Sequence, residues 1–178
     1  MAHRTLPLSE VYGLLEPGPV LLMSTAHRGR ANVMTLSWQT MLEFEPPLVG
    51  VVVSAQDFSH TALRLTRQCV LNLPGAELAD AVVGCGNTSG RSTDKFVAYG
   101  LTALPSAMVA PPRIAQCHAQ LECRVVDTRL MKRYDFFVLE VVQAWLDPRR
   151  RNARTLHHRG RGAFMLAGET IRLPSAMR

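Results

Sequence analysis

The sequence contains no long apolar run, and none of its hydrophobic stretches reaches the roughly 18 residues that a membrane-spanning helix needs. Its first residues, MAHRTLPLSEVYGLLEPG, also lack the extended apolar core of a secretory signal. We therefore expect neither a membrane protein nor a secreted one, and the cytoplasm is the expected location.

The sequence also lacks the cysteine patterns of metal and redox motifs. Its four cysteines form no C-x-x-C pair, and no group of His and Cys has the spacing of a zinc site. Adjacent strand residues point to opposite faces, so the pair His157–His158 does not suggest a metal site either. We expect no metal, and we expect the thiols to be buried as small apolar groups. The cysteines are Cys69, Cys85, Cys117 and Cys123.

Three common site motifs are missing as well. The stretch GCGNTSG, residues 84–90, is one residue too long for G-x-G-x-x-G, and it lacks the G-K-[ST] ending of a P-loop. Ser89 does not stand in a G-x-S-x-G elbow. These differences argue against a Rossmann domain, a P-loop enzyme and an α/β-hydrolase.

The sequence does have an ordinary globular composition with an excess of positive charge. Its 178 residues, 47% of them hydrophobic, suit a single domain spanning 1–178. The formal net charge of +6 suggests an anionic partner. A nucleotide, a nucleic acid and an acidic surface all satisfy this condition, so the charge alone does not choose among them.

The hydrophobic pattern predicts antiparallel strands with helices between them. Alternation over 32–39 and 116–125 indicates half-buried strands, with His118 on the outward face of the second. The nearly unbroken apolar residues of 48–53 and 134–145 indicate strands covered on both faces. We therefore predict a mainly β protein, a small β-barrel with inserted helices. Further strands are expected at 20–26 and 70–73. Helices are expected at 10–15, from 59, at 76–83 and from Ser92 or Thr93 to 99, with a loop at 84–90. A loose arm is expected at 1–8, and a basic segment at 147–178 that ends in one more short strand or hairpin over 162–174.

Two polar stretches are candidate anion sites. Ser54 and the run Ser59-His60-Thr61 surround the start of a predicted helix, where free N–H groups and the helix dipole favour an anion. Taken alone, a simple helix cap explains them better. Further along, Ser89-Gly90-Arg91 and Lys95 combine a permissive backbone with two cations, although, taken alone, a solvated surface loop explains them better.

The order of several short motifs resembles the flavin reductase-like family of FMN-binding split-barrel proteins, of the flavoredoxin kind. The resemblance covers roughly residues 15–170. The resemblance implies a split barrel, a homodimer and FMN at the subunit interface. The motifs are Asn32-x-x-Thr35-x-x-Trp38, Pro46-Pro47-Leu48-Val49-Gly50-Val51, His60-Thr61, Asn72-Leu73-Pro74, Ser89-Gly90-Arg91-x-x-Asp94-Lys95-Phe96, Gly100-Leu101 and Leu121-Glu122-Cys123.

The resemblance also assigns cofactor-binding residues. It places the isoalloxazine ring along the strand 32–39, where an ordinary core role is the alternative for the same side chains. It places the ribityl phosphate near both polar stretches described above. The ring candidates are Asn32, Met34, Thr35, Leu36, Ser37 and Trp38, and the phosphate candidates are Ser54, Ser59, His60, Thr61, Ser89, Gly90, Arg91 and Lys95.

The expected function is an FMN-binding oxidoreductase. It would transfer hydride from NADH or NADPH to the flavin and pass electrons to a second acceptor, such as a monooxygenase partner. No acid–base catalyst is expected, since positioning of the donor at the flavin supplies most of the catalysis. Two alternatives stay open: a flavin-binding electron carrier or sensor without turnover, and an anion- or nucleic-acid-binding barrel. The arginine-rich tail has few aromatic residues for base stacking, which makes nucleic acid the weaker alternative.

Overall fold

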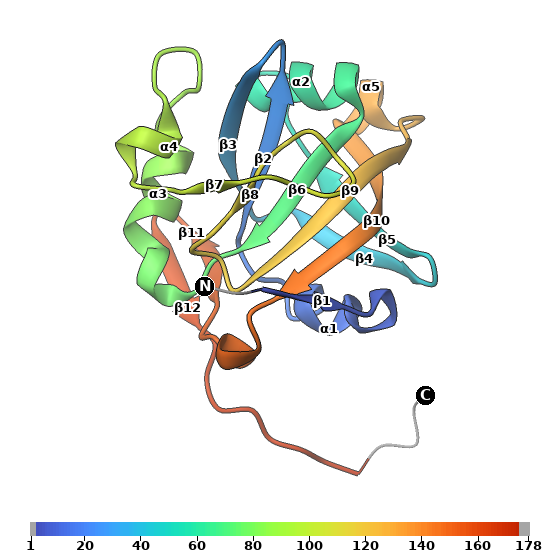
Figure 1. Cartoon of the computed structure of the whole chain (residues 1–178), viewed down its shortest axis with the longest axis vertical. Coiled ribbons are helices and arrows are strands. Elements are labelled where there is room, and N and C mark those ends of the chain that lie inside the picture. The colour runs from blue at the N-terminus through green and yellow to red at the C-terminus, as the bar shows by residue number, and fades with distance from the viewer. Residues whose placement is uncertain (1–2, 175–178) are drawn as a thin grey trace.

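The molecule is built around one strongly curved antiparallel sheet. The computed structural model describes residues 3–174, and its main sheet has the strand order β3-β2-β6-β9-β10-β5-β4, with β1 added alongside β10 (Figure 1). The strands are β1 (Arg4–Leu6), β2 (Leu21–His27), β3 (Arg30–Leu36), β4 (Gln39–Phe44), β5 (Pro47–Val52), β6 (Gln68–Leu73), β9 (Ala119–Asp127) and β10 (Phe136–Leu146).

The two end strands of this sheet, β3 and β4, are joined by only two residues. Ser37 and Trp38 connect them, and the carbonyl of Trp38 accepts a hydrogen bond of 3.1 Å from the N–H of Val52 in β5. A two-residue link cannot cross a flat sheet from edge to edge, because each residue spans at most about 3.6 Å. The sheet therefore curls into a barrel, which confirms the predicted β-barrel fold with inserted helices.

The strand predicted over 32–39 is corrected by this link. It ends at Leu36, and a separate strand, β4, follows it before the Pro46–Pro47 corner. Alternation of polar and apolar residues continues through Ser37 and Trp38, so periodicity did not indicate the break. Trp38 is 70% exposed as a result.

The helices cover the ends and sides of the barrel. In Figure 1, α2 (Phe58–Thr66) lies at one end with α5 (Met131–Tyr134), and α1 (Tyr12–Leu15) lies at the other. α3 (Ala79–Asn87) and α4 (Lys95–Ala98) lie beside β3. Short 3-10 helices occupy Leu8–Glu10, Ala76–Leu78 and Pro148–Arg150. Within the described residues, no helix is long and apolar enough to span a bilayer.

Two apolar cores hold these layers. The larger fills the barrel and includes Phe137, Leu139 and both Cys69 and Cys123, while the smaller packs α3 against the outer face of β2 and β3. All four cysteines are free and buried, as expected.

The loop expected at 84–90 is instead largely helical, since α3 continues to Asn87. Its glycines permit close packing. A Cβ atom on Gly84 would lie 2.2 Å from Cε1 of Tyr99, so a side chain there would displace the ring. The predicted capping of the next helix by Ser92 or Thr93 is also wrong, because the carboxylate of Asp94 accepts the N–H groups of the first turn of α4.

Most of the outward face of β9 is buried, although Arg124 is exposed. A strap of residues 101–115, which contains the short strands β7 (Ala103–Leu104) and β8 (Arg113–Ile114), crosses this face (Figure 1). Glu122 is fully buried beneath it and accepts bonds from the backbone N–H of Ala107 and Met108 and from the indole of Trp145. His118 is only 2% exposed, so the expected surface position of this histidine is wrong.

The N-terminal arm is more ordered than predicted, and part of the basic C-terminal segment forms a hairpin. The arm predicted to be loose over 1–8 pairs with β10 through β1, although residues 1 and 2 lie outside the described residues. The basic segment contains a hairpin of β11 (Leu156–Gly160) and β12 (Ala163–Leu166). Its residues 175–178 also lie outside the described part. Three tail arginines make ion pairs with carboxylates, namely Arg149 with Asp147, Arg150 with Glu77 and Arg151 with Glu10.

Candidate functional site

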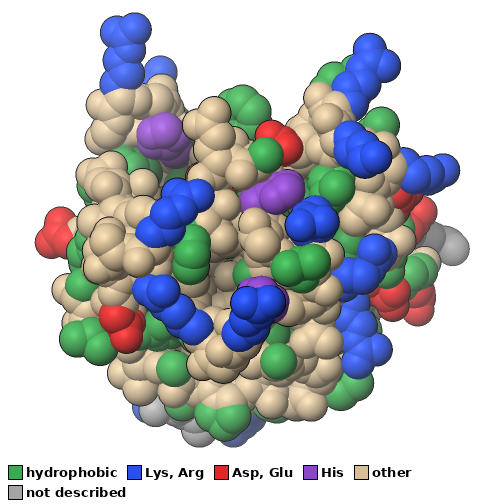
Figure 2. All heavy atoms as spheres, turned by 90° about the horizontal axis from the view of Figure 1, so that it is seen from above, with side chains coloured by type: hydrophobic (Ala, Val, Ile, Leu, Met, Phe, Trp, Pro, Cys, Tyr) green, Lys and Arg blue, Asp and Glu red, His purple; other side chains and the backbone are tan. Residues whose placement is uncertain are grey.

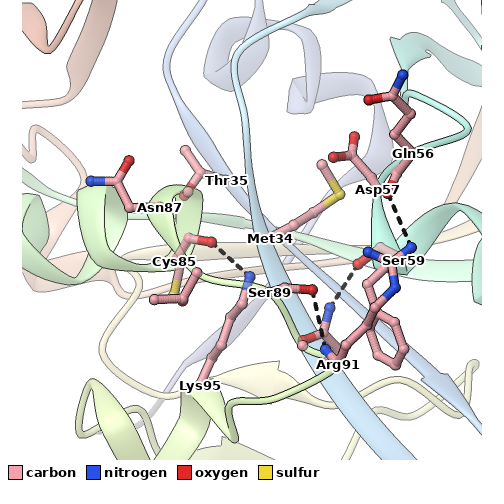
Figure 3. A pocket seen from close by; sticks show the side chains of 15 residues that line it. Met34, Thr35, Gln56, Asp57, Ser59, Cys85, Asn87, Ser89, Arg91 and Lys95 are labelled. Atoms are coloured by element: carbon pink, nitrogen blue, oxygen red, sulfur yellow. Dashed lines mark hydrogen bonds between the residues drawn. The ribbon is translucent and has the colours of Figure 1, made fainter.

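A polar pocket of about 300 Å³ lies beside β3. We call it the main pocket. Its walls come from β3, from the turn that starts α2, and from the end of α3 with the loop that leads to α4 (Figure 3). The lining residues are Asn32, Met34, Thr35, Gln56, Asp57, Phe58, Ser59, Cys85, Gly86, Asn87, Thr88, Ser89, Gly90, Arg91 and Lys95.

Lys95 brings a buried positive charge to this pocket. It is 4% exposed, and its Nζ donates a hydrogen bond of 2.7 Å to the carbonyl of Cys85, near the end of α3. No carboxylate oxygen among the described residues lies within 4.0 Å of this ammonium group. Burial lowers the pKa of Lys95 below its ordinary value of 10.5, and nearby Cys85 and Asp57 only partly offset that effect. A buried cation without a paired anion is unfavourable, so the site favours an incoming anion.

The first turn of α2 supplies neutral donors on the opposite wall. Asp57 is its N-cap residue, but the Asp57 side chain makes no capping bond. The backbone N–H groups of Phe58 and Ser59 belong to the first turn, where no intrahelical acceptor exists. The amide of Asn32 on β3 donates a bond of 2.9 Å to the Ser59 hydroxyl, which ties the sheet to the helix start.

Gly90 allows the loop before α4 to approach this junction. A Cβ atom there would lie 2.2 Å from Oδ1 of Asn32 and 2.6 Å from Cδ1 of Phe58. The carbonyl of Gly90 accepts a bond from the guanidinium of Arg30, and the guanidinium of Arg91 donates to the carbonyl of Gln56 at 3.3 Å. Two arginines therefore join the loop to β3 and to the turn before α2.

A second pocket of about 270 Å³ continues from the main pocket toward the tip of the β2–β3 hairpin. We call it the adjoining pocket. It shares Asn32, Phe58 and Arg91 with the main pocket. Its other lining residues are Thr25, His27, Arg30, Thr61 and Ala62.

The end of the molecule that carries α2 is rich in cationic side chains. Figure 2 views this end directly and shows Lys and Arg side chains spread over it, with His among them and fewer Asp and Glu. In the adjoining pocket the guanidinium carbons of Arg30 and Arg91 lie 5.4 and 5.9 Å from the centre of the Phe58 ring. Positive charge is therefore concentrated at the adjoining pocket, which favours anions.

The structure brings eight of the predicted cofactor residues together in the main pocket, and Thr61 lies in the adjoining one. The other five lie elsewhere. Leu36 is buried in the barrel core, and Ser37 and Trp38 form the link to β4. The eight are Asn32, Met34, Thr35, Ser59, Ser89, Gly90, Arg91 and Lys95.

Ser54 and His60 are the remaining two. The hydroxyl of Ser54 accepts a bond from the N–H of Gln56 inside the turn, and it lines neither pocket. His60 is buried and packs edge-on against the ring of Phe137 at 5.4 Å between centroids. His60 therefore belongs to the barrel side of α2.

Sequence reasoning missed several residues that line the main pocket. Most come from the end of α3, which was expected to be a loop, and the rest from the turn before α2. A signal was present, because a helix with Gly84 and Gly86 points to close packing. The missed residues are Gln56, Asp57, Phe58, Cys85, Gly86, Asn87 and Thr88.

Comparison with known proteins identifies the family of this chain. The family model described as "Flavin reductase like domain" matches residues 14–164. An uncharacterized protein of Escherichia coli K12, YddH, is 30% identical over 172 residues, covering 89% of this chain and 91% of that protein. The reductase component of a 4-nitrophenol monooxygenase from Rhodococcus opacus is 32% identical over 125 residues, covering 70% of this chain and 64% of that protein.

A solved structure agrees with the sequence matches. An FMN-binding domain of a flavin reductase-like enzyme from Shewanella baltica OS155 superposes with a TM-score of 0.91, at 26% identity and with 97% of this chain and 98% of that chain covered. The family model covers most of the chain, and the predicted resemblance is confirmed. The chain belongs to the flavin reductase-like family of FMN-binding split-barrel proteins.

Proposed function

We propose that this protein is an NAD(P)H-dependent flavin oxidoreductase that binds FMN in the main pocket. The observation that carries the proposal is the buried ammonium of Lys95, which faces the pocket with a backbone carbonyl as its hydrogen-bond partner. A phosphate would supply the missing negative charge. Such groups bind well where cations, hydroxyls and free N–H donors converge.

The donor set of the pocket fits a phosphate ester. Lys95 and Arg91 supply charge, Ser59 and Ser89 supply hydroxyls, and the first turn of α2 supplies backbone N–H groups. The one carboxylate in the lining, Asp57, accompanies two cations, so the balance still favours an anion. These residues would hold the ribityl phosphate.

The neighbouring part of β3 fits the flavin ring. β3 is an edge strand that pairs only with β2 among the described strands, so the N–H and C=O groups along its other edge are free of the ladder. Met34 and Thr35 are half-buried there and line the main pocket. We propose that Met34, Thr35 and the backbone through Trp38 hold the ring, and bound FMN supplies the redox chemistry.

The residues of this chain would act by binding and orientation. The hydroxyl of Thr35 donates to the carbonyl of Val82, which fixes β3 against α3. The Asn32–Ser59 bond fixes β3 against α2. A rigid strand edge of this kind would set the position of the ring relative to an incoming NADH or NADPH. Holding donor and acceptor in register is an effective source of rate acceleration.

The proposed electron acceptor is a second protein or a small oxidant. The Rhodococcus relative is a reductase component of a monooxygenase. Its similarity to this chain supports, for this protein, a role in supplying reduced flavin to a monooxygenase partner. The cytoplasm is the location that we propose for it.

We further propose a homodimer that uses the surface around β4. This edge strand exposes Leu42 and Phe44, and Trp38 precedes it. The ring of Tyr12 packs edge-on against that of Phe44 at 5.1 Å, and Tyr12 is itself 40% exposed. Grouped apolar side chains on an unpaired strand are typical of a protein interface.

The two alternative functions would use different parts of the molecule. A flavin carrier or sensor would use the same pocket without oxidising NADH or NADPH. A nucleic-acid-binding barrel would use the arginine-rich tail, but three of its arginines already pair with carboxylates. Those pairs favour a structural role for this segment.

The test is a visible spectrum of the purified protein with FMN, followed by anaerobic addition of NADH or NADPH. The proposal expects bound flavin whose absorbance bleaches with one of the donors. Bound flavin that neither donor bleaches would favour the carrier. Absence of binding at excess FMN would refute the proposal, and DNA binding that weakens steeply with salt would then support the nucleic-acid alternative.

A further inference from the structure

After the β11–β12 hairpin the chain continues as an extended segment, residues 168–174, which we call the C-terminal arm. Just before the arm, the N–H of Ala167 donates to the carbonyl of Thr155, and the carbonyl of Ala167 accepts from the side chain of Arg154. Beyond Ala167 the arm makes no hydrogen bond within the described residues, and all of its residues are exposed. Figure 1 shows it running clear of the barrel. The body of its own chain therefore holds only the start of the arm.

The arm has the alternating pattern of a strand, but its apolar side chains face water. Ile171 and Leu173 are 70% and 75% exposed, and the polar residues Thr170 and Arg172 alternate with them. Residues two apart in an extended chain point to the same side, so Ile171 and Leu173 form one apolar face. An exposed apolar face of this kind is typical of a segment that binds another surface.

A groove of about 520 Å³ lies between the end of α1 and β4, and we call it the β4 groove. Apolar side chains line it from both elements, namely Leu15, Met41, Leu42 and Phe44. Two of them, Leu42 and Phe44, are 47% and 60% exposed. Gln39 also lines the groove, and its Oε1 atom is buried without a hydrogen-bond partner in the described structure. The groove therefore offers an apolar surface and an acceptor for an incoming donor.

The charges of the groove and of the arm are complementary. The described lining of the β4 groove contains two carboxylates, those of Glu16 and Glu43, and no basic residue. Both glutamates are exposed, so they lie at the rim. If the apolar face of the arm enters the groove, Arg172 points away from the floor, toward these carboxylates. The acidic residue of the arm, Glu169, lies three positions nearer the hairpin.

We propose that the C-terminal arm of one copy of this chain lies in the β4 groove of a second copy. The proposal rests on the homodimer proposed above and gives it a specific contact. An arm that folded back into its own groove would gain from the high effective concentration of a tethered segment. The arm nevertheless stays clear of its own chain, which favours a second copy as the occupant. In a two-fold symmetric dimer each copy gives one arm and receives one.

Cross-linking identifies the chain that supplies the arm. Leu173→Cys places a thiol on the arm and Leu42→Cys places one in the groove, and all four native cysteines are buried. The two variants, one carrying a tag that identifies the mixed dimer by size, are mixed, oxidised mildly and separated on a non-reducing gel. The control mixture replaces Leu42→Cys with Leu130→Cys, because Leu130 is 48% exposed and lies outside the groove. We expect the mixed covalent dimer to form at least about tenfold faster than in the control, since a bound arm has a high effective concentration.

Analytical ultracentrifugation measures the association of the two copies. Replacing both Ile171 and Leu173 with serine removes the apolar face of the arm. We expect the dimer to dissociate at about a hundredfold higher concentration, since burial of each such side chain is worth about tenfold or more. Val97→Ser is the control, because Val97 is 79% exposed and lies outside the groove. It should associate as wild type does.

The possible failures are distinguishable. A bond within one chain of the double variant Leu42→Cys/Leu173→Cys, with none between copies in the mixture, would seat the arm in its own groove and overturn the proposal. Wild-type association of the double serine variant would overturn the arm contact and leave the homodimer standing. A wild-type chain that stays monomeric would refute both the arm contact and the homodimer. The spectrum with FMN and its bleaching would still decide the oxidoreductase function separately.

Discussion

Replacing Lys95 with methionine removes the buried positive charge of the main pocket and keeps a side chain of similar length. Lys95 is 4% exposed, and it lines a pocket that contains a single carboxylate, that of Asp57. A hydrogen bond to a charged group contributes about 1.5–3 kcal/mol. We therefore expect the affinity for FMN to fall by about tenfold to a hundredfold, since each 1.4 kcal/mol is about tenfold. The control is Lys132→Met, which changes the only other lysine of the chain, on the exposed surface of α5.

Loss of the proton from Lys95 should affect the stability of the protein and its affinity for FMN in opposite directions. Its folded pKa lies below the unfolded value of 10.5, so the unfolded chain binds more protons between these two values. The free energy of unfolding of the ligand-free protein should therefore rise with pH across that interval, measured as the difference between wild type and Lys95→Met. FMN affinity should instead fall as the amine loses its charge, and this fall should be absent from Lys95→Met.

The assay combines urea unfolding of the ligand-free protein with FMN titration by flavin fluorescence, each at several pH values. Equal FMN affinities for wild type, Lys95→Met and Lys132→Met would refute the assignment of Lys95 to the phosphate. If both pH trends ran in the same direction, a buried, initially unpaired ammonium would be the wrong description of this site.

Three further substitutions test close packing and burial. Gly90→Ala should weaken FMN binding at least about tenfold and destabilise the fold by roughly 1–3 kcal/mol, because the new Cβ would lie 2.2 Å from Oδ1 of Asn32. Gly84→Ala should destabilise the fold by a similar amount, roughly 1–3 kcal/mol, through its collision with Tyr99. Burial lowers the pKa of His118 to about 4 from 6.5, so stability should be lost as pH falls through this interval. The loss approaches roughly 3 kcal/mol at about 1.4 kcal/mol per pKa unit, and His118→Gln should remove it.

Urea unfolding measures the stability of all three variants, and FMN titration measures binding by Gly90→Ala. Gly168→Ala controls for the loss of glycine because nothing lies within 4 Å of its Cβ position. Wild-type stability in Gly90→Ala or Gly84→Ala would contradict the close contacts. An acid transition that persists unchanged in His118→Gln would show that another group is responsible.

The sequence was sufficient for the barrel because its strands alternate or are continuously apolar, and these patterns depend on local side chains. The sequence was insufficient where contacts between residues far apart in the chain determine the local structure. After Leu36 the chain passes from one end strand of the curled sheet to the other, and the close packing at Gly84 depends on its neighbour Tyr99. The burial of Glu122 depends on a strap that carries no strong periodic signal.

The candidate site was predicted where short motifs are local and missed where the fold brings together unrelated segments. Asn32, Ser59 and Lys95 were identified from family motifs, and the structure brings them to one pocket. Cys85 and Asn87 were not identified, because their stretch was taken for a loop. Leu36 illustrates the reverse case, since its neighbours line the pocket while its own side chain faces the core.

The strand order of the sheet has a consequence for biosynthesis. Every described residue of the main pocket lies between positions 32 and 95, yet β6 has β9 as its second neighbour and β5 has β10 as its second neighbour in the sheet. β10 ends at Leu146, so 51 further residues (146 − 95) follow Lys95 before that strand is complete. At about 5–20 residues per second, their synthesis takes roughly 3–10 s. The segments that form the pocket are therefore translated several seconds before the strands that complete the sheet around them.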